Sequence, residues 1–397
     1  MKTSGGIPKG SWPARIGLVL CGLLMAALAG EILLRASGYQ PPAILTPEMR
    51  AACQIEPNGH FTYHGYLTGM FSDFATPVQL NSRSFHDIEH PEQRAVPGAF
   101  RLMVIGDSYV ADLSCPLETT FYRRLEVRLN QADPLGRPAY EVIACGQGNQ
   151  GEEKEQRYIT ELGPVYQPDA VLLLFFCGND IMENEPETFQ AARHFALRYQ
   201  RDIAPWKAAL YNRLRVCPRS RLNGLLAEAA TTFYADHLNW FVPGLTAADL
   251  VSPELGVYRR PLEPVWQAAY DRTGELLAQM KAECEKIHAT FMVAGLSGPQ
   301  AVGDVAEHDL LTGRTAGLDP GQPARWLEDW CREHGVPYVA LDPPLKAAGW
   351  RQVFWRHDGH LNPRGNEVIV EPLFRQVVDA LGPQAGENAA APAPRGI

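Results

Sequence analysis

The chain has 397 residues, of which 46% are hydrophobic and 20% charged, the composition of a globular protein with one large domain or two modest ones. Its formal net charge is −9 and its pI is near 5.7, and no basic block stands out that would contact phosphates. These values argue against a nucleic-acid partner.

The N-terminal segment has the pattern of a membrane anchor. Every charged side chain in the first fifteen residues is basic, and an apolar run from Ile16 to Leu34 follows, interrupted only by Glu31. A run of roughly 20 apolar residues spans a bilayer, and basic residues that precede it stay in the cytoplasm. We therefore expect residues 1–36 to be a cytoplasmic tail and single-pass anchor, with the rest of the chain on the extracytoplasmic (periplasmic) side. The alternative is a signal peptide cleaved after Ala27-Leu28-Ala29.

Eight cysteines in an exported chain could pair as disulfides, but the positions of several argue against it. Cys21 lies inside the anchor, and Cys145 and Cys177 end apolar runs that resemble buried strands. No CxxC spacing occurs, so neither a zinc site nor a redox motif is supported. The sequence implies no metal and no organic cofactor.

Residues 37–98 have little periodicity and are interpreted as a stalk and a packed N-terminal extension; after them, apolar runs alternate with helical segments. The runs are Arg101–Ile105, Tyr140–Cys145, Ala170–Cys177, Thr290–Leu296 and Val336–Leu341. Helices are expected near 151–163, 264–287 and 323–334, and a last one from Asn362-Pro363 that Pro372 should kink or shorten. Continuous apolar runs are typical of strands covered on both faces. The pattern predicts an α/β fold, a three-layer α/β/α sandwich with a five-stranded parallel sheet and a site at the carboxyl edge of its strands.

Residues 181–262 fit this alternation poorly and carry many aromatic side chains. We interpret them as an insertion in a domain that spans residues 99–382, either a lid over the site or a helical cap with its own core. The tail, residues 383–397, has the composition of a disordered segment.

Four polar blocks accompany the predicted strands. Gly106-Asp107-Ser108 follows the first strand, Gly146-Gln147-Gly148-Asn149 the second, and Gly178-Asn179-Asp180 the third, while His357-Asp358-Gly359-His360 precedes the final helix. In the last block, a carboxylate and an imidazole two residues apart can meet, and the imidazole can then take a proton from a serine. Each block alone has an ordinary alternative, a turn or a polar surface loop. A metal pair of His357 and His360 has no third ligand at a suggestive spacing.

In order and position, these four blocks resemble the motifs of the SGNH (GDSL) hydrolase family, over roughly residues 80–380. Asn81-Ser82-Arg83-Ser84-Phe85 also resembles the short motif that precedes the first strand in membrane-anchored bacterial members. The resemblance implies a flavodoxin-like SGNH hydrolase fold and a serine esterase. It makes Ser108 the nucleophile and His360 the general base and then acid, with Asp358 orienting His360.

The resemblance also implies an oxyanion hole made by the Ser108 N–H, a backbone N–H of Gly148 or Asn149, and the side chain of Asn179. Two features depart from the family pattern. Family members more often have glycine where Asn149 aligns, which leaves open which N–H faces the oxyanion. Asp358 precedes His360 by two residues where many members have three, which keeps His357 as an alternative base.

The expected reaction is removal of acyl groups, acetyl above all, from an extracytoplasmic ester such as a carbohydrate or cell-surface polysaccharide. Export and the aromatic-rich insertion favour a sugar, because aromatic faces stack on sugar rings. A lipid ester is an alternative substrate. Two alternative functions are an O-acyltransferase acting on polysaccharide and a catalytically silent polysaccharide-binding scaffold with the hydrolase fold.

Overall fold

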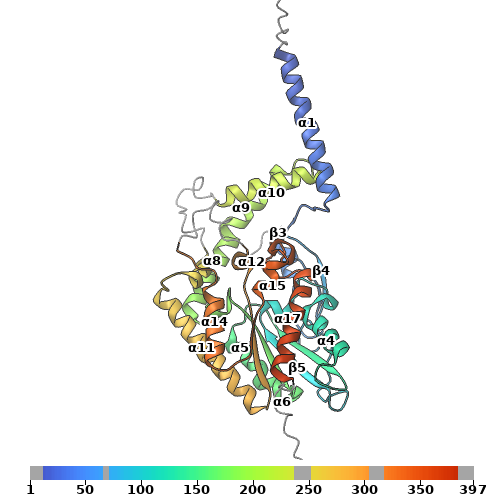
Figure 1. The fold of residues 1–397 in the computed structure, drawn as a ribbon. Helices are drawn as coiled ribbons and strands as arrows, with labels where there is room; N and C mark the ends of the chain where they lie inside the picture. Colours follow the sequence, from blue (N-terminus) through green and yellow to red (C-terminus); the bar gives the residue numbers. More distant parts are fainter. Residues whose placement is uncertain (1–11, 66–70, 237–251, 304–316, 383–397) are drawn as a thin grey trace, which may run out of the picture. The chain divides into compact units, whose positions relative to one another are not determined.

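The computed structural model describes residues 12–65, 71–236, 252–303 and 317–382 (Figure 1). The predicted disordered tail at residues 383–397 lies outside the described residues. The chain divides into two compact units. The smaller comprises residues 1–44 and 200–247, and the larger comprises residues 45–199 and 248–397.

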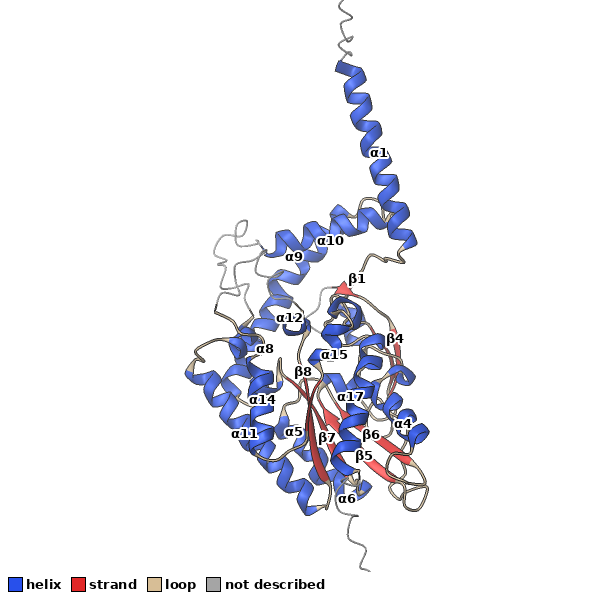
Figure 2. Cartoon of the chain, in the orientation of Figure 1, coloured by secondary structure: helices blue, strands red, loops and turns tan. Residues whose placement is uncertain are grey.

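The larger unit is built on a five-stranded parallel sheet in the order β6-β5-β7-β8-β9 (Figure 2). Its strands are β5 (Phe100–Gly106), β6 (Tyr140–Gly146), β7 (Ala170–Phe176), β8 (Thr290–Leu296) and β9 (Tyr338–Ala340). The predicted sheet is thus confirmed, with β9 shorter than the expected run. The strand order reverses direction around β5, and in such doubly wound sheets ligands bind outside the carboxyl ends of the strands at that point.

Helices cover both faces of this sheet, which confirms the three-layer sandwich. On one face, Leu102 and Val104 of β5 pack with the apolar sides of α4 (Phe121–Ala132) and α17 (Pro363–Leu381). On the other face, Met103 and Ile105 pack with α11 (Pro264–Lys286) and α14 (Gln322–Glu333). This unit also contains α8 (Pro186–Arg198) and several shorter helical elements: α2 (Pro47–Ala51), α3 (Ser108–Ala111), η1 (Leu117–Thr119), α5 (Glu152–Arg157), α6 (Gly163–Tyr166), α7 (Asp180–Glu183), η6 (Pro253–Tyr258), α12 (Pro299–Val302), α15 (Asp342–Ala347) and α16 (Trp350–Val353).

Two predicted helices differ in detail from the structure. The segment expected at 151–163 is interrupted by a π-helical turn, η2 (Tyr158–Leu162). Pro372 does not end α17, which continues to Leu381. A proline inside a helix removes only one backbone hydrogen bond, and the buried Ile369, Leu373 and Val377 pack this helix onto the sheet through that position.

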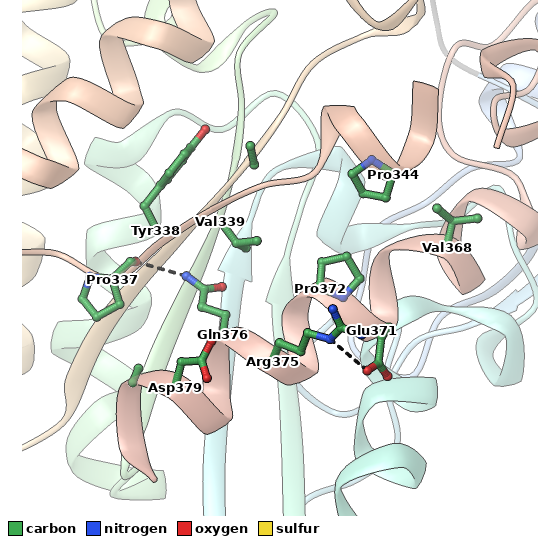
Figure 3. A pocket seen from close by; sticks show the side chains of 12 residues that line it. Pro337, Tyr338, Val339, Pro344, Val368, Glu371, Pro372, Arg375, Gln376 and Asp379 are labelled. Atoms are coloured by element: carbon green, nitrogen blue, oxygen red, sulfur yellow. Dashed lines mark hydrogen bonds and ion pairs between the residues drawn. The ribbon is translucent and has the colours of Figure 1, made fainter. Parts of the chain in front are cut away.

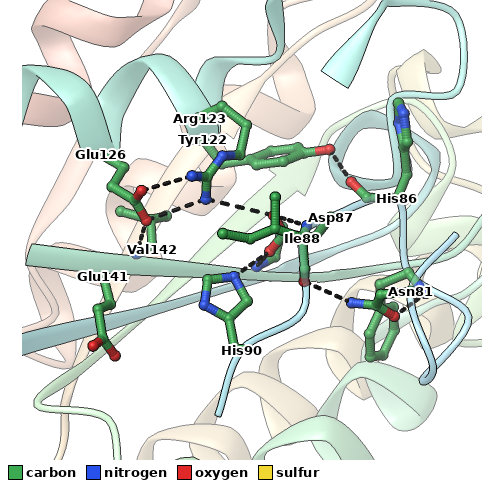
Figure 4. Close-up of polar contacts among 12 residues, drawn as sticks. Asn81, His86, Asp87, Ile88, His90, Tyr122, Arg123, Glu126, Glu141 and Val142 are labelled. Carbon is green, nitrogen blue, oxygen red and sulfur yellow. Dashed lines mark hydrogen bonds and ion pairs between the residues drawn. The ribbon is translucent and has the colours of Figure 1, made fainter. Parts of the chain in front are cut away.

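The outer edge of β6 is closed by side chains (Figure 4). Along the strand, the N–H of Tyr140 donates to Asn130, that of Val142 to Glu126, and that of Ala144 to Asp87. Arg123 lies between the two carboxylates, and the His90 ring lies 2.9 Å from Asp87. An edge strand with unpaired N–H groups can pair with a strand of another chain and so promote aggregation. These side-chain contacts occupy the N–H groups of β6 and prevent such pairing. They also tie the segment before β5 to the sheet. Earlier in the chain, β2 (His60–Tyr63) and β4 (Thr76–Gln79) form a separate antiparallel pair, and β3 (Phe71–Ser72) lies between them in sequence.

The opposite edge borders a cavity of about 850 Å³ between β9 and α17 (Figure 3). The Gln376 amide donates to the carbonyls of Val293 and Pro337 at its base, 2.8 and 3.1 Å away. Glu371 and Arg375 form an exposed ion pair on its rim. The side chains that line it include none of the polar blocks singled out in the sequence.

The smaller unit contains α1 (Trp12–Ala36), β1 (Ala43–Ile44), α9 (Ala204–Leu214) and α10 (Arg221–Asp236). The π-helical turn η3 (Tyr199–Ile203) precedes α9, and all of its residues except the first belong to this unit. No side chain of α1 is buried, and the helix is long and apolar enough to cross a membrane; a signal sequence would have the same properties. All eight cysteines of the chain are free thiols.

Candidate active site

Ser108 lies at the carboxyl end of strand β5, as the first residue of α3. Asp107 caps this helix: one carboxylate oxygen accepts the N–H of Tyr109 at 2.9 Å, and the other lies 3.2 Å from the Ser108 hydroxyl. Burial raises the pKa of Asp107, and the Tyr109 N–H counteracts this. The cap holds the serine at the edge of the sheet.

Two glycines let α3 approach the strand ends. A Cβ atom on Gly106 would lie 2.5 Å from the side chain of Val110, and one on Gly146 would lie 2.6 Å from the backbone nitrogen of Ala111. Contacts this short do not occur in proteins, so a larger residue at either position would push α3 away from the sheet. The glycines of the first two blocks therefore have a packing role beneath Ser108.

Asp358 and His360 lie on the loop between α16 and α17. A β-bridge between Phe354 and Leu361 closes this loop at its base, and Gly359 turns it with a φ of +86°. The left-handed backbone at Gly359 favours glycine. The turn brings the two flanking side chains to the same side.

The structure brings Ser108, His360 and Asp358 together in one hydrogen-bonded chain. His360 Nε2 lies 2.8 Å from Ser108 Oγ, and His360 Nδ1 lies 2.5 Å from Asp358 Oδ1. The Asp358 side chain is fully buried, and that of His360 is 14% exposed. A carboxylate that accepts the Nδ1 proton leaves Nε2 as the acceptor facing the serine.

The charges around His360 change its basicity. Burial by itself lowers the pKa of the imidazole, but the Asp358 carboxylate, which is both charged and hydrogen-bonded to the ring, raises it. Asp107 and Asp112 act in the same direction. The net result is a pKa above the usual 6.5, which makes His360 a stronger base than an isolated histidine.

The block after β6 lies next to the serine. A Cβ atom on Gly148 would lie 3.6 Å from Cβ of Ser108, and Asn149 has a left-handed φ of +59°. Among the described residues, the N–H groups of Ser108 and Gly148 have no hydrogen-bond acceptor. Two backbone donors are therefore available where a negatively charged oxygen would need them.

Asn179 lies in the turn between β7 and α7. Its side chain contacts both Asp107, which precedes the serine, and Glu183. Its amide Nδ2 donates to Glu183 Oε1 at 3.0 Å, and its side chain also interacts with the Asp107 carboxylate. Asp180, the next residue, accepts the N–H of Phe176 at 2.7 Å and so fixes the loop. One proton of the Asn179 amide is thus held by Glu183, which orients the other.

A model of the GDSL-like lipase/acylhydrolase family matches residues 104–368, which is more than half of the chain and includes Ser108 and His360. The chain belongs to this family. The predicted resemblance is confirmed, and the protein is an esterase of the GDSL type. No curated protein matches the chain.

Several solved structures are similar to this GDSL hydrolase at low identity. The acetyl xylan esterase AlAXEase is 11% identical, with a TM-score of 0.38 over 70% of this chain and 100% of its own. A catalytic mutant of an acetylxylan esterase from Geobacillus stearothermophilus is 12% identical, with a TM-score of 0.38 over 72% of this chain and 96% of its own. The lipase/acylhydrolase from Enterococcus faecalis is 11% identical, with a TM-score of 0.36 over 70% of this chain and 96% of its own.

The GDSL hydrolase positions its histidine loop with residues that the motifs do not reveal. Asp73 Oδ2 accepts the backbone N–H groups of His357 and Asp358 at 2.6 and 3.2 Å, and the Tyr109 hydroxyl donates to the Gly359 carbonyl at 3.0 Å. Tyr109 directly follows the serine, and this position next to the first polar block is a signal in the sequence that points to it. Asp73 lies 284 residues from His357, and no local pattern points to it.

His357, the alternative base, has a different environment. Its ring lies 4.9 Å from the Phe71 ring, and its Nε2 lies 3.9 Å from Asp73 Oδ1. The imidazole in contact with the Ser108 hydroxyl is that of His360. The geometry therefore favours His360 over His357 as the partner of the serine.

Buried acidic side chains lie next to the site, between α5 and α7. Burial raises the pKa of Glu183 to about 8, and burial together with neighbouring carboxylates raises those of Glu155 and Asp180 well above their usual range. Glu183 is therefore largely uncharged at neutral pH. A neutral Glu183 holds the Asn179 amide without adding a negative charge beside the serine.

Proposed function

We propose that the protein is a serine ester hydrolase in which Ser108 is the nucleophile, His360 the general base and acid, and Asp358 the residue that orients His360. The observation that carries this proposal is the continuous hydrogen-bonded chain from Ser108 Oγ through the imidazole to the buried Asp358 carboxylate. His360 takes the serine proton as Oγ attacks the ester carbonyl, and returns it to the leaving alcohol. Water, activated by the same imidazole, then releases the acyl group.

The oxyanion of each tetrahedral intermediate is proposed to lie between three donors: the N–H of Ser108, the N–H of Gly148 or Asn149, and the side-chain amide of Asn179. The available N–H groups of Ser108 and Gly148 and the closeness of Gly148 to the serine support the first two. The place of Asn179 beside Asp107, at the end of β7 and with its amide fixed by Glu183, supports the third.

The proposed substrate is an acetyl ester of a carbohydrate or cell-surface polysaccharide. The loop that passes the serine carries the amide side chains Gln147, Asn149 and Gln150, all partly exposed, around the exposed Gly148. Amide groups hydrogen-bond to hydroxyl-rich alcohols. A long acyl chain would instead require an apolar groove beside the serine.

The proposed location is the extracytoplasmic face of a membrane, with α1 as an uncleaved single-pass anchor. Its 25 residues extend over ~37 Å at 1.5 Å per residue, enough for a hydrocarbon core of ~30 Å. The contacts of Glu31 with Ser220 and Leu222 tie the C-terminal end of this helix to the start of α10.

The substrate proposal predicts a preference for short acyl groups on sugars. The full chain, solubilised in detergent, should release acetate from an O-acetylated polysaccharide and hydrolyse p-nitrophenyl acetate, and act far more slowly on p-nitrophenyl palmitate. The measurement is acetate and p-nitrophenol release at matched substrate concentrations. A preference for the palmitate ester would contradict the carbohydrate proposal and favour a lipid ester.

Asn179→Ala is expected to lower kcat by about 10²–10³-fold, the usual cost of removing one oxyanion donor. KM should change little, because the donor acts mainly on the charged intermediate. Steady-state kinetics with p-nitrophenyl acetate provides the test, with Asn223→Ala, a substitution in the smaller unit, as the control. Full activity of Asn179→Ala would show that this amide is not an oxyanion donor.

A further inference from the structure

Helix α10 begins on the C-terminal part of α1, within the same compact unit. The Glu31 carboxylate accepts hydrogen bonds from the Ser220 hydroxyl at 2.8 Å and from the N–H groups of Arg221 and Leu222 at 3.2 and 3.0 Å. The Arg221 guanidinium donates in turn to the last carbonyls of α1. Each helix therefore caps the end of the other, which fixes the start of α10 at the end of the apolar run.

An apolar stripe runs along α10 from that junction. Leu222 lies against Gly30 of α1, and Leu226, Ala229 and Phe233 follow at intervals of four, three and four residues, on the same face of the helix. Leu226 is 59% exposed and Phe233 is 52% exposed. The stripe thus begins at the proposed membrane span and continues outward at the surface of the unit.

The other side of α10 is occupied by its own unit. Gly224 packs against Pro41, Glu228 accepts a hydrogen bond from Tyr39 at 2.7 Å, and Thr231 is buried. The exposed apolar stripe is therefore the outward face of a helix whose inner face is already packed. Figure 2 shows α10 running crosswise to α1, so a bilayer crossed by α1 extends along α10.

The segment beside this stripe is strongly basic. No acidic residue lies between Ala204 and Ala227, whereas five basic residues do: Lys207, Arg213, Arg215, Arg219 and Arg221. Arg35, at the end of α1, adds another, and its guanidinium lies 3.0 Å from the Arg219 carbonyl. Trp206 of α9 is 56% exposed, and tryptophan is enriched at membrane interfaces. Clustered basic residues next to a span attract anionic headgroups.

We infer that α9 and α10 form a membrane-surface element that binds anionic phospholipid headgroups of the leaflet from which α1 emerges. The Leu226–Phe233 stripe enters the boundary between headgroups and acyl chains, and the basic side chains contact the headgroups. This inference rests on the proposed anchor, and it adds a second, peripheral contact with the same bilayer. Such a contact restricts how far this unit can tilt from the membrane.

The test places a fluorescent NBD label at one position at a time in the full chain. Leu226→Cys reports on the stripe, Leu24→Cys on the span, and Val127→Cys, on the exposed surface of α4, serves as the matched control. Each is made in a chain whose more accessible cysteines, Cys21, Cys53 and Cys217, are replaced by serine. The proteins are reconstituted in phosphatidylcholine nanodiscs with or without phosphatidylglycerol, containing a lipid-bound nitroxide quencher.

With phosphatidylglycerol present, the label at position 226 is expected to lose more than about half of its fluorescence, as a group inserted at the acyl-chain boundary does. The label at position 127 should lose little. Omitting phosphatidylglycerol, or combining Arg213→Glu with Arg219→Glu, should reduce the loss at position 226 and leave that at position 24 unchanged.

Three outcomes would overturn the inference in distinguishable ways. If the label at position 24 is quenched but the label at position 226 is quenched no more than the control at position 127, the anchor is supported and the surface element is excluded. Absence of quenching at position 24 shows that the anchor itself is wrong, and the inference is lost with it. Quenching at position 226 that does not depend on phosphatidylglycerol or on the two arginines excludes anionic headgroups as the partner.

Discussion

Replacing Ser108 by alanine is expected to lower kcat for ester hydrolysis by about 10⁴–10⁶-fold, because no other hydroxyl can take the place of the nucleophile. The residual rate would come from the oxyanion donors and from substrate binding. The fold should be retained, since the Asp107 cap on Tyr109 and the packing of α3 on Gly106 do not involve the serine hydroxyl. Hydrolysis of p-nitrophenyl acetate and labelling by a fluorophosphonate probe are the two measurements.

Ser82→Ala is the matched control, because that serine is exposed and its hydroxyl donates to Glu89 in the N-terminal part of the same unit. It should retain full activity and probe labelling. If Ser108→Ala kept its activity or still reacted with the fluorophosphonate, another nucleophile would be responsible and the proposed mechanism would fail.

Asp358→Asn is expected to lower kcat/KM by about 10⁴-fold at neutral pH, the effect of losing the carboxylate that fixes the imidazole tautomer. The pH profile provides a second readout. In the unmodified enzyme, His360 must be neutral to accept the serine proton, so kcat/KM should fall as the pH drops below a midpoint that lies above 6.5. Removing the Asp358 charge lowers the pKa of His360 and should move this midpoint to lower pH.

The control is His357→Gln on the same loop. It should leave both the rate and the midpoint close to those of the unmodified enzyme, because the His360 imidazole is the one that contacts Ser108. If His357→Gln abolished activity while His360→Gln did not, the assignment of the base would have to be exchanged. An unchanged midpoint in Asp358→Asn would show that this carboxylate does not set the basicity of His360.

The parallel sheet could be predicted from local patterns. Thr290–Leu296 was expected as a strand and is one with the same bounds, and the runs after residues 100, 140 and 170 agree within a residue or two. Buried parallel strands are apolar on both faces, so each leaves a continuous signal in the sequence. The start of α17 was equally readable: Asn362 accepts the N–H groups of Arg364 and Gly365, as an N-cap does.

Local sequence patterns predicted the structure less well where tertiary contacts decide the length of an element or the grouping of segments. β9 is three residues long, at the edge of the sheet and paired with one neighbour only, so the apolar run around it overstates the strand. Pro372 was expected to kink or shorten α17; the helix is not shortened there and continues to Leu381, with buried side chains on both sides of the proline packed on the sheet. The grouping of residues 200–247 with the N-terminal helix has no signature in the sequence.

For the candidate site, the sequence by itself indicated which side chains have the chemistry of an ester hydrolase, because Ser108, Asn179, Asp358 and His360 follow strand ends or precede a capped helix. Only the tertiary structure decided how they are held. Asp73 fixes the histidine loop from 284 residues away, Glu183 is a neutral partner of Asn179 because it is buried, and Asp87 closes the sheet edge from outside the strands. Burial and long-range hydrogen bonds depend on which segments meet in space, and a local pattern of residues carries no information on that.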